Sequence, residues 1–463
     1  MMTQTLAQFA IETRTADVPD AALDAAQNAV IDTVGVALAG SLEPVAEIAL
    51  RWTRELGARP YATVWGQCLA TSPAEAAFAN GVCSHALDFD DTHPGPRGHA
   101  SATLVPVAIA TGELAGASGE EVLAAYAVAL EIGGKIGRAL GPGHLARGWH
   151  PTATVGIFAA TVAAGRLMGL DVSGLCRAWG IAASQMGGLV RNFGTMTKPF
   201  HAGHAARCGV VSAWMARSGF TSDERIFDGK GGVLETYGGG NGEPLDEVLH
   251  SLGKPWEVLD PGNYVKRWPC CYSNHRALGG LLELIDAHEI RLEEITEVSI
   301  GFLPGGDSAL VSRDPQTGLE GKFSIEYVVA AMLTDKALTL ETFTDAMVQR
   351  PHVREVMRKV RRHAIPDSRM YSGIAGYNDV IVTTARGRFE QQVDRVPGSP
   401  AWPMTDADRA AKFADCAGRV LGTPGVARLL ELCQRCRTLA NIRALVQATV
   451  PETACERPAV GTG

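Results

Sequence analysis

Hydrophobic residues recur at helical spacing through roughly the first 260 residues. Pro19 and Asp20 are typical of a helix start, and the apolar residues that follow share one helical face: Leu23, Ala26, Val30, Val34 and Leu38. Similar segments rich in Ala, Gly, Leu and Val follow at about 74–87, 101–115, 119–140, 151–169, 172–189 and 203–218. This pattern predicts a helical domain whose small side chains let the backbones approach closely.

The pattern changes near Pro255–Pro269. Beyond it, residues 295–302 alternate and are rich in β-branched side chains, which predicts a strand. Residues 379–384 and 388–393, separated by a short Ala-Arg-Gly turn, predict a β-hairpin. Helical segments lie between them at about 324–337 and 341–348. The region therefore predicts a smaller α+β domain.

Helical periodicity returns at Thr405, where Asp408 three residues later forms a variant capping box for a helix reaching Val420. The simplest organisation returns the last 60 or so residues to the first domain. We therefore predict a mainly α protein in which a large all-helical domain, residues 1–266 with 401–463, carries an inserted α+β lid, residues 267–400.

Composition and charge narrow the class of protein. The chain has 463 residues, of which 46% are hydrophobic, as expected of a globular protein with a large core. Its 42 Lys and Arg against 50 Asp and Glu give a net charge of −8, and no basic tract appears, so nucleic acid is not an expected partner. The start of the chain lacks a signal-peptide pattern and no apolar stretch approaches the ~20 residues of a membrane helix, which predicts a cytoplasmic protein.

Candidate chemistry concentrates between residues 85 and 204, which hold seven of the twelve histidines. In the segment from His85 to His99, a helical stretch runs into three carboxylates, Thr92 and two more imidazoles before a Pro/Gly-rich turn. Catalytic groups often lie on such loops. A solvated capping loop and a His/Asp metal site are the alternatives, although no HExxH spacing supports the metal.

Two further segments add an imidazole and a cation. His150 stands directly before Pro151, which can begin a helix, and a helix N-terminus favours neutral imidazole. Lys198 lies among aromatic, Gly and Thr residues before a helix, where an ammonium and backbone amides can receive a carboxylate. Their structural alternatives are a packed histidine and a surface lysine.

Cations and a phenol also occur beyond the domain boundary. Lys266 and Arg267 lie among aromatic residues and thiols, and Tyr327 stands near the start of a helix, where a tyrosine more often packs in a core. Cys433 and Cys436 have the CxxC spacing of a redox or metal site but lie in a helical stretch, so we interpret them as structural.

Five segments, in this order, resemble the MmgE/PrpD family, which includes 2-methylcitrate dehydratases, cis-aconitate decarboxylases and iminodisuccinate epimerases. They are LDFDDT (87–92) with His99, GWHPTAT (148–154), FGTMTKPFHAGHAAR (193–207), KRWPCC (266–271) and KFSIEYVVA (322–330). The resemblance covers nearly the whole chain. It implies a helical domain, an α+β lid, a homodimer and a site that needs no cofactor or metal.

Carried over position by position, the resemblance indicates seven site residues: Asp88, Thr92, His99, His150, Lys198, Lys266 and Tyr327. One stretch departs from the pattern. Classical methylcitrate dehydratases have an HPSDN-like sequence where this chain has His99-Ala-Ser-Ala-Thr, so the Asp-Asn pair is missing.

These residues support a hypothesis of proton transfer next to a carboxylate of a small di- or tricarboxylic acid. Lys198 and Lys266, with Arg267, hold the substrate carboxylates, and His99 or His150 moves the proton. Asp88 orients an imidazole, and Thr92 binds the substrate. We expect a cofactor-independent lyase that dehydrates or decarboxylates its substrate. An epimerase using the same proton transfer and a metal-dependent hydratase are the alternatives.

Overall fold

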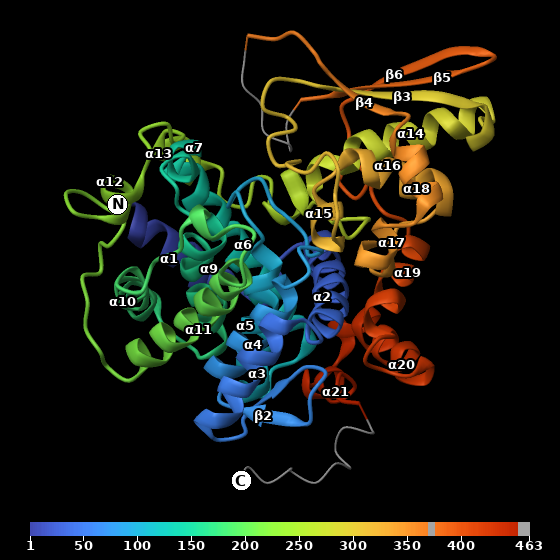
Figure 1. The fold of residues 1–463 in the computed structure, drawn as a ribbon. Coiled ribbons are helices and arrows are strands. Elements are labelled where there is room, and N and C mark those ends of the chain that lie inside the picture. Colours follow the sequence, from blue (N-terminus) through green and yellow to red (C-terminus); the bar gives the residue numbers. More distant parts are fainter. Residues whose placement is uncertain (369–375, 452–463) are drawn as a thin grey trace. The chain divides into compact units, whose positions relative to one another are not determined.

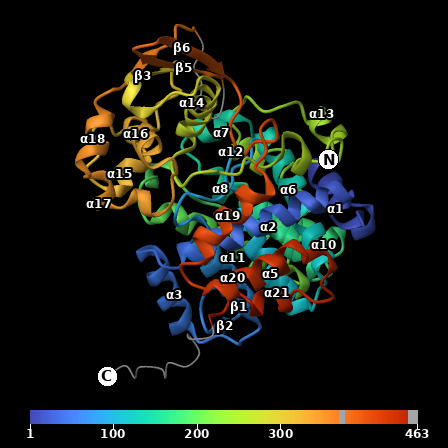
Figure 2. The same cartoon turned by 90° about the vertical axis from the view of Figure 1, so that its right-hand side faces the viewer.

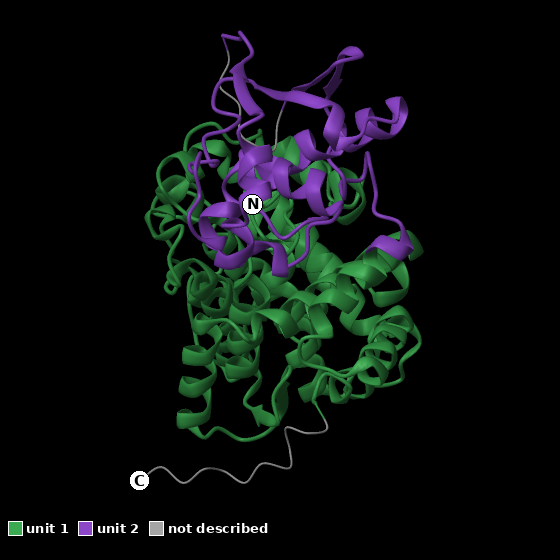
Figure 3. Ribbon diagram, turned by 45° about the vertical axis from the view of Figure 1, so that its right-hand side comes forward, with its two compact units in different colours: residues 1–264, 409–463 green, residues 265–408 purple. Residues whose placement is uncertain are grey.

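The computed structural model describes residues 1–368 and 376–451, which form two compact units. Unit 1 comprises residues 1–264 and 409–463, and unit 2 comprises residues 265–408 (Figure 3). The boundaries predicted from the sequence were 266/267 and 400/401.

Unit 1 is built almost entirely from helices (Figure 1). Its N-terminal part contains α1 (Met2–Glu12), α2 (Asp20–Gly40), α3 (Pro44–Leu56), α4 (Pro73–His85), α5 (Ala100–Ala115), α6 (Gly119–Leu140), α7 (Pro142–Ala146), α8 (Pro151–Thr154), α9 (Gly156–Leu167), α10 (Val172–Ala183), α11 (Thr197–Arg217), α12 (Val233–Tyr237) and α13 (Leu245–His250). After unit 2 the chain returns through α19 (Asp406–Ala417), α20 (Thr423–Gln434) and α21 (Arg443–Gln447). Helix α20 contacts α2, as Figure 2 also shows.

Small residues determine how the helices of unit 1 pack. Helices α4 and α11 cross where Gly81 meets Gly203, and a Cβ atom built on Gly203 would lie 2.5 Å from the Phe78 carbonyl oxygen. Only a residue without a side chain allows this approach. The crossing matters for function because α4 ends at His85 and α11 begins one residue before Lys198.

Unit 1 is not wholly helical, which corrects the prediction of an all-helical domain. Strands β1 (Ala62–Val64) and β2 (Leu69–Thr71) form a short antiparallel hairpin. The β-branched residues Thr63, Val64 and Thr71 favour the extended backbone, and Gly66 supplies a positive φ of 73° in the connecting turn.

Unit 2 combines one sheet with several helices. Its helices are α14 (His275–His288), α15 (Gly318–Lys322), α16 (Ile325–Asp335), α17 (Asp345–Val348) and α18 (Pro351–Met357). The sheet has the order β4-β3-β5-β6, formed by β4 (Val360–Ala364), β3 (Ile295–Phe302), β5 (Asn378–Thr384) and β6 (Gly387–Val393). Strand β4 runs parallel to β3, and the other pairs are antiparallel.

The strand at 295–302 and the hairpin agree with the sequence pattern to within one residue, because alternation marks a half-buried sheet face. Strand β4 was not predicted. Its central residues Arg361, Arg362 and His363 do not alternate with apolar residues, so the sequence pattern does not mark a strand. The segment is extended because it pairs with β3. Helix α14 covers the sheet by contacting β5 and β6.

Among the described residues no single helix is long and apolar enough to cross a membrane. Helices α2 and α3 pass that test of length and composition only as a pair bent by 90°.

We expect Gly203→Ala to destabilise the protein by about 1–3 kcal/mol, the usual cost of overpacking, because the added methyl group must push α4 and α11 apart. The free energy of unfolding in denaturant measures this cost. Gly187→Ala is the matched control, since a Cβ atom there meets nothing within 4 Å. Equal stability of the two variants would contradict the close-packing argument.

Candidate active site

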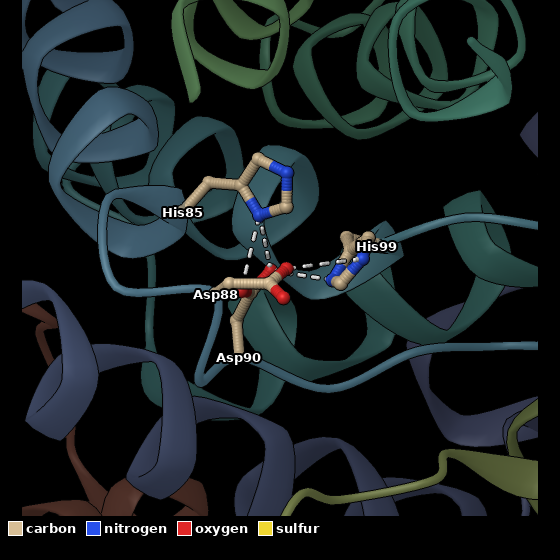
Figure 4. Close-up of side chains that lie close together, drawn as sticks. All are labelled: His85, Asp88, Asp90 and His99. Carbon is tan, nitrogen blue, oxygen red and sulfur yellow. Dashed lines mark hydrogen bonds and ion pairs between the residues drawn. The ribbon is translucent and has the colours of Figure 1, made fainter. Parts of the chain in front are cut away.

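The centre of the candidate site lies where α4 ends and α5 begins (Figure 4). His85 is the last residue of α4, and His99 is the N-cap residue of α5. The loop between them turns at Asp88, whose φ of 54° is left-handed, a conformation that Asp adopts more readily than most residues. The turn brings Asp88 and Asp90 back between the two imidazoles.

Asp90 is fully buried and is shared by both histidines. His85 Nδ1 lies 2.9 and 3.0 Å from the two Asp90 carboxylate oxygens, and His99 Nδ1 lies 3.0 Å from Oδ2. The His99 contact has the length of a hydrogen bond, although its N–H direction is off line in this conformation. The rings of His85 and His99 are 4.4 Å apart.

The electrostatics of this cluster favour an ionised carboxylate beside a neutral His85. Burial by itself would raise the pKa of Asp90, but His85 and His99 outweigh it and hold that pKa well below its usual range. Burial is also the largest effect on His85, and with Lys198 and His99 it lowers the pKa of His85 to about 4, against the attraction of Asp90.

An ionised carboxylate only accepts hydrogen bonds, so His85 Nδ1, which is hydrogen-bonded to Asp90, carries a proton. A proton on His99 Nδ1 is the arrangement that suits its 3.0 Å distance to Asp90 Oδ2. In neutral imidazole the other nitrogen is then an unprotonated acceptor. Asp90 thereby assigns the tautomer of His99 and leaves its Nε2 free to take a proton, as in the orienting role of a carboxylate in a catalytic triad.

The Lys198 ammonium and His99 Nε2 both lie near the same oxygen of Asp88. Lys198 Nζ is 2.6 Å from Asp88 Oδ1, and His99 Nε2 is 3.8 Å from the same oxygen. The ammonium also lies over the Phe193 ring, 5.6 Å from its centroid. Because Lys198 and Asp88 are both only partly buried, an anionic ligand can compete with Asp88 for the ammonium.

A second imidazole pair extends the cluster. His150 is the N-cap residue of α8, and its Nδ1 lies 3.0 Å from Nδ1 of His201, so one donates and the other accepts. Its ring stacks against His85 at 6.2 Å. Burial, followed by Lys198 and the neighbouring histidines, lowers the pKa of His150 well below its usual range, which keeps the ring neutral.

The structure thus brings together four of the predicted residues in unit 1: Asp88, His99, His150 and Lys198. Thr92 lies on the same loop, where its backbone pairs with Tyr264, and its buried hydroxyl has no hydrogen-bond partner among the described residues. A buried hydroxyl with unused capacity suits ligand binding.

Three predicted residues lie in unit 2. Lys266 is buried, with 1% of its surface exposed. Arg267 is 3.0 Å from Asp408 and lies over the Trp268 ring. Its charge is already neutralised, which counts against its predicted role as a carboxylate ligand.

The surroundings of Tyr327 likewise do not support the catalytic role predicted for it. The side chain is completely buried, and its hydroxyl donates a 2.5 Å hydrogen bond to the Thr342 carbonyl. Burial raises the pKa of the phenol to about 12. Tyr327 is therefore a core residue of unit 2, the alternative considered from sequence.

Sequence reasoning missed His85, Asp90 and His201 as site residues. His85 and Asp90 stand in the segment that was singled out, three residues before and two residues after Asp88. A turn after a helix brings such positions together, so the density of His and Asp was the available signal. The signal for His201 was weaker, because Ala202 and Gly203 follow it and no carboxylate stands nearby in the sequence.

Four of these side chains also have the spacing of a metal site. One ligand atom from each of His85, Asp88, Asp90 and His99 lies within 4.8 Å of the others. The residues present do not fit a divalent ion well, because Lys198 already occupies the cation position at Asp88. A metal bound to that oxygen would lie beside an ammonium and would have to displace it.

Cys433 and Cys436 are free, buried thiols, as the structural interpretation predicts. Burial raises the pKa of Cys436 to about 12 and that of Cys433 well above its usual value. Neither is poised as a thiolate for redox or metal chemistry.

Comparison with known proteins gives matches along most of the chain. Residues 4–245 match the MmgE/PrpD N-terminal domain, and residues 268–436 match the MmgE/PrpD C-terminal domain. Human cis-aconitate decarboxylase is 29% identical over 458 residues, covering 95% of this chain and 93% of the human protein. The mouse protein of that name is 28% identical over 90% of this chain and 87% of its own length, and one from Aspergillus terreus is 27% identical over 78% and 77%.

We expect acid to weaken the fold partly through His85. Unfolded His85 takes up a proton near its ordinary pKa of about 6.5, whereas folded His85 does so only near 4. The unfolded state therefore binds more protons between these values, and stability falls as pH is lowered through that window, by up to about 3 kcal/mol from this group.

Denaturant unfolding at several pH values between 7 and 4 measures the effect. His85→Asn should reduce the loss of stability on acidification, whereas His352→Asn, at an exposed position, should not. Identical slopes for wild type and His85→Asn would show that His85 is not held neutral.

Proposed function

The chain belongs to the MmgE/PrpD family, and on that premise we propose that it is a lyase that decarboxylates a small tricarboxylate of the cis-aconitate type. The observation that carries the proposal is the His99–Asp90 pair beside the Lys198 ammonium. Decarboxylation is favoured over dehydration because the relatives named above are cis-aconitate decarboxylases.

Lys198 supplies the charge that binds the substrate. A substrate carboxylate replaces Asp88 as the partner of the ammonium, whose position is already set by Asp88 and the Phe193 ring. A cation that faces developing negative charge where water is excluded stabilises it by several kcal/mol more than in water. Lys266 stays the predicted second cation, on the strength of the family resemblance.

The reaction breaks one carbon–carbon bond and makes one carbon–hydrogen bond. The carboxylate on the saturated carbon of cis-aconitate leaves as CO₂, and its bonding electron pair spreads over the adjacent double bond towards another carboxylate. Protonation at the far carbon gives an unsaturated dicarboxylate with a terminal methylidene group. Each turnover therefore consumes one proton.

His99 is the proposed proton donor. Asp90 lies at its Nδ1, so the proton that passes to the substrate is the one on Nε2, the nitrogen on the side of Asp88. His150 is the second imidazole that can act on the substrate. Thr92 is the proposed hydroxyl that orients a carboxylate.

The enzyme is proposed to need no metal or organic cofactor, because the Lys198 ammonium can stabilise the developing charge and His99 can supply the proton. Closure of unit 2 as a lid, a homodimeric state and a cytoplasmic location stay predictions. Epimerisation remains a possible outcome of the same proton transfer, but no contact in the site favours it.

We expect the chelator-treated protein to convert cis-aconitate in D₂O to CO₂ and a dicarboxylate carrying one deuterium, as read by NMR. Citrate, 2-methylcitrate and iminodisuccinate are tested in parallel. Elemental analysis confirms that metal has been removed. Loss of activity on chelation with recovery on adding metal would establish the hydratase alternative, and deuterium exchange into iminodisuccinate without CO₂ would establish the epimerase.

His99→Ala should lower the turnover number by at least about 100-fold, the usual contribution of a general acid or base. His352→Ala, at an exposed position of unit 2, is the control and should keep full activity. A His99→Ala enzyme with near wild-type turnover would remove His99 from the mechanism.

A further inference from the structure

A closed set of hydrogen bonds lies behind the loop that carries Asp88 and Asp90. Asp91 Oδ2 is 2.5 Å from Ser101 Oγ and 2.7 Å from Asn263 Nδ2. The Tyr126 hydroxyl is 2.7 Å from the same Ser101 oxygen and 2.8 Å from the same Asn263 nitrogen. All four residues belong to unit 1, and Asp91, Ser101 and Tyr126 are buried.

The donors of these groups fix the direction of every bond. Asn263 has two N–H groups, one for the Asp91 carboxylate and one for the Tyr126 hydroxyl. Tyr126, having accepted from Asn263, donates its own proton to Ser101, and Ser101 donates to Asp91. Both branches therefore end on one oxygen, Asp91 Oδ2, which accepts both bonds when the carboxylate is ionised. Burial, followed by the charge of Asp32, raises the pKa of Asp91 to about 7, so its charge is already partly lost near neutral pH.

These hydrogen bonds join the two chain segments that carry Asp90 and the candidate proton donor, His99. Asp91 follows Asp90 directly, and Ser101 stands two residues after His99 in the first turn of α5. The bond between Asp91 and Ser101 therefore holds the loop against the start of the helix in the register at which Asp90 meets His99.

Two other contacts hold the same loop on either side of Asp91. Thr92 and Tyr264 exchange backbone hydrogen bonds of 3.0 and 2.8 Å, directly after Asn263 in the chain. Lys412 donates to the Phe89 carbonyl at 2.9 Å and is paired with Asp32 at 2.5 Å. Because Lys412 already has Asp32 as its counter-ion, Asp91 is not needed to neutralise it.

We infer that Asp91, Ser101, Tyr126 and Asn263 are positioning residues that set the separation and alignment of Asp90 and His99. The inference rests on the proposed function in so far as His99 is its proton donor. A proton donor must be held within a fraction of an ångström, since a misplacement of about 1 Å can cost 100-fold in rate. What Asp91 contributes is an acceptor oxygen at a fixed place, and its charge is not required.

Comparing Asp91→Asn with Asp91→Ala tests this. The Asn side chain keeps one acceptor oxygen for Ser101 and Asn263, whereas Ala leaves both donors without a partner and releases the loop. We expect Asp91→Ala to lower kcat by about 10- to 100-fold with KM changed less than about threefold. Asp91→Asn should keep kcat within about threefold of wild type, because only alignment is needed.

If Asp91→Asn were as damaging as Asp91→Ala, the charge or proton of Asp91 would be what matters, and the inference would be overturned. Near wild-type kcat in Asp91→Ala would overturn it as well. Should Asp91→Ala fail to fold, as judged by circular dichroism, Tyr126→Phe takes its place. It removes the bonds of the Tyr126 hydroxyl to Ser101 and Asn263, which orient the two donors to Asp91, and should lower kcat several-fold. An unchanged kcat would count against the inference.

A second measurement needs no substrate and so separates this inference from the proposed function. Nitrogen-15 NMR of the imidazoles should show His99 protonated at Nδ1 in the wild type and in Asp91→Asn. A mixture of the two tautomers is expected in Asp91→Ala, because Asp90 is then no longer aligned with the ring. That result would support the positioning role of these four residues even if the enzyme turned over none of the carboxylates tested. An unchanged His99 tautomer in Asp91→Ala would refute the positioning role.

Discussion

Burial of one carboxylate between two imidazoles is the constraint on which the rest of the site depends. Asp90 is removed from water, which by itself is costly, and the hydrogen bonds from His85 together with the nearby His99 imidazole stabilise its ionised form. That requirement fixes where both rings lie and which of their nitrogens carry protons. Because Nδ1 of His99 is turned towards Asp90, its Nε2 is left on the side of Asp88, the partner of the Lys198 ammonium.

The scaffold of unit 1 supplies these groups from elements that are distant in the sequence. Helix α4 ends at His85, α5 begins after His99, α8 begins after His150, and α11 carries Lys198 and His201. Glycines at the α4–α11 crossing allow the two backbones to meet, so that the end of one helix and the start of the other reach the same place. Small residues in the helices are therefore part of how the site is built.

Much of the fold could be predicted because periodicity reports directly on burial. Helices α2, α5 and α6, the strand at 295–302 and the hairpin after it were found at nearly their observed bounds, whereas α11 begins six residues before the predicted segment. Helices α1 and α3 were not predicted. Strand β4 and the β1–β2 hairpin were missed. They are short or polar, and neighbouring strands rather than their own patterns make them extended.

Within the site, residue identity alone was enough to find the groups that can do chemistry: a segment dense in His and Asp, an imidazole before Pro151, and a lysine in apolar surroundings. Tertiary structure decided which of these groups meet. In the folded chain His99 Nδ1 lies next to Asp90 and not Asp88. His85 and His201 join the site as further imidazoles. Arg267 pairs with Asp408, and Tyr327 packs in the core of unit 2. The physical reason is that hydrogen bonds and ion pairs depend on distances of about 3 Å between groups far apart in the chain, which residue identity and spacing do not specify.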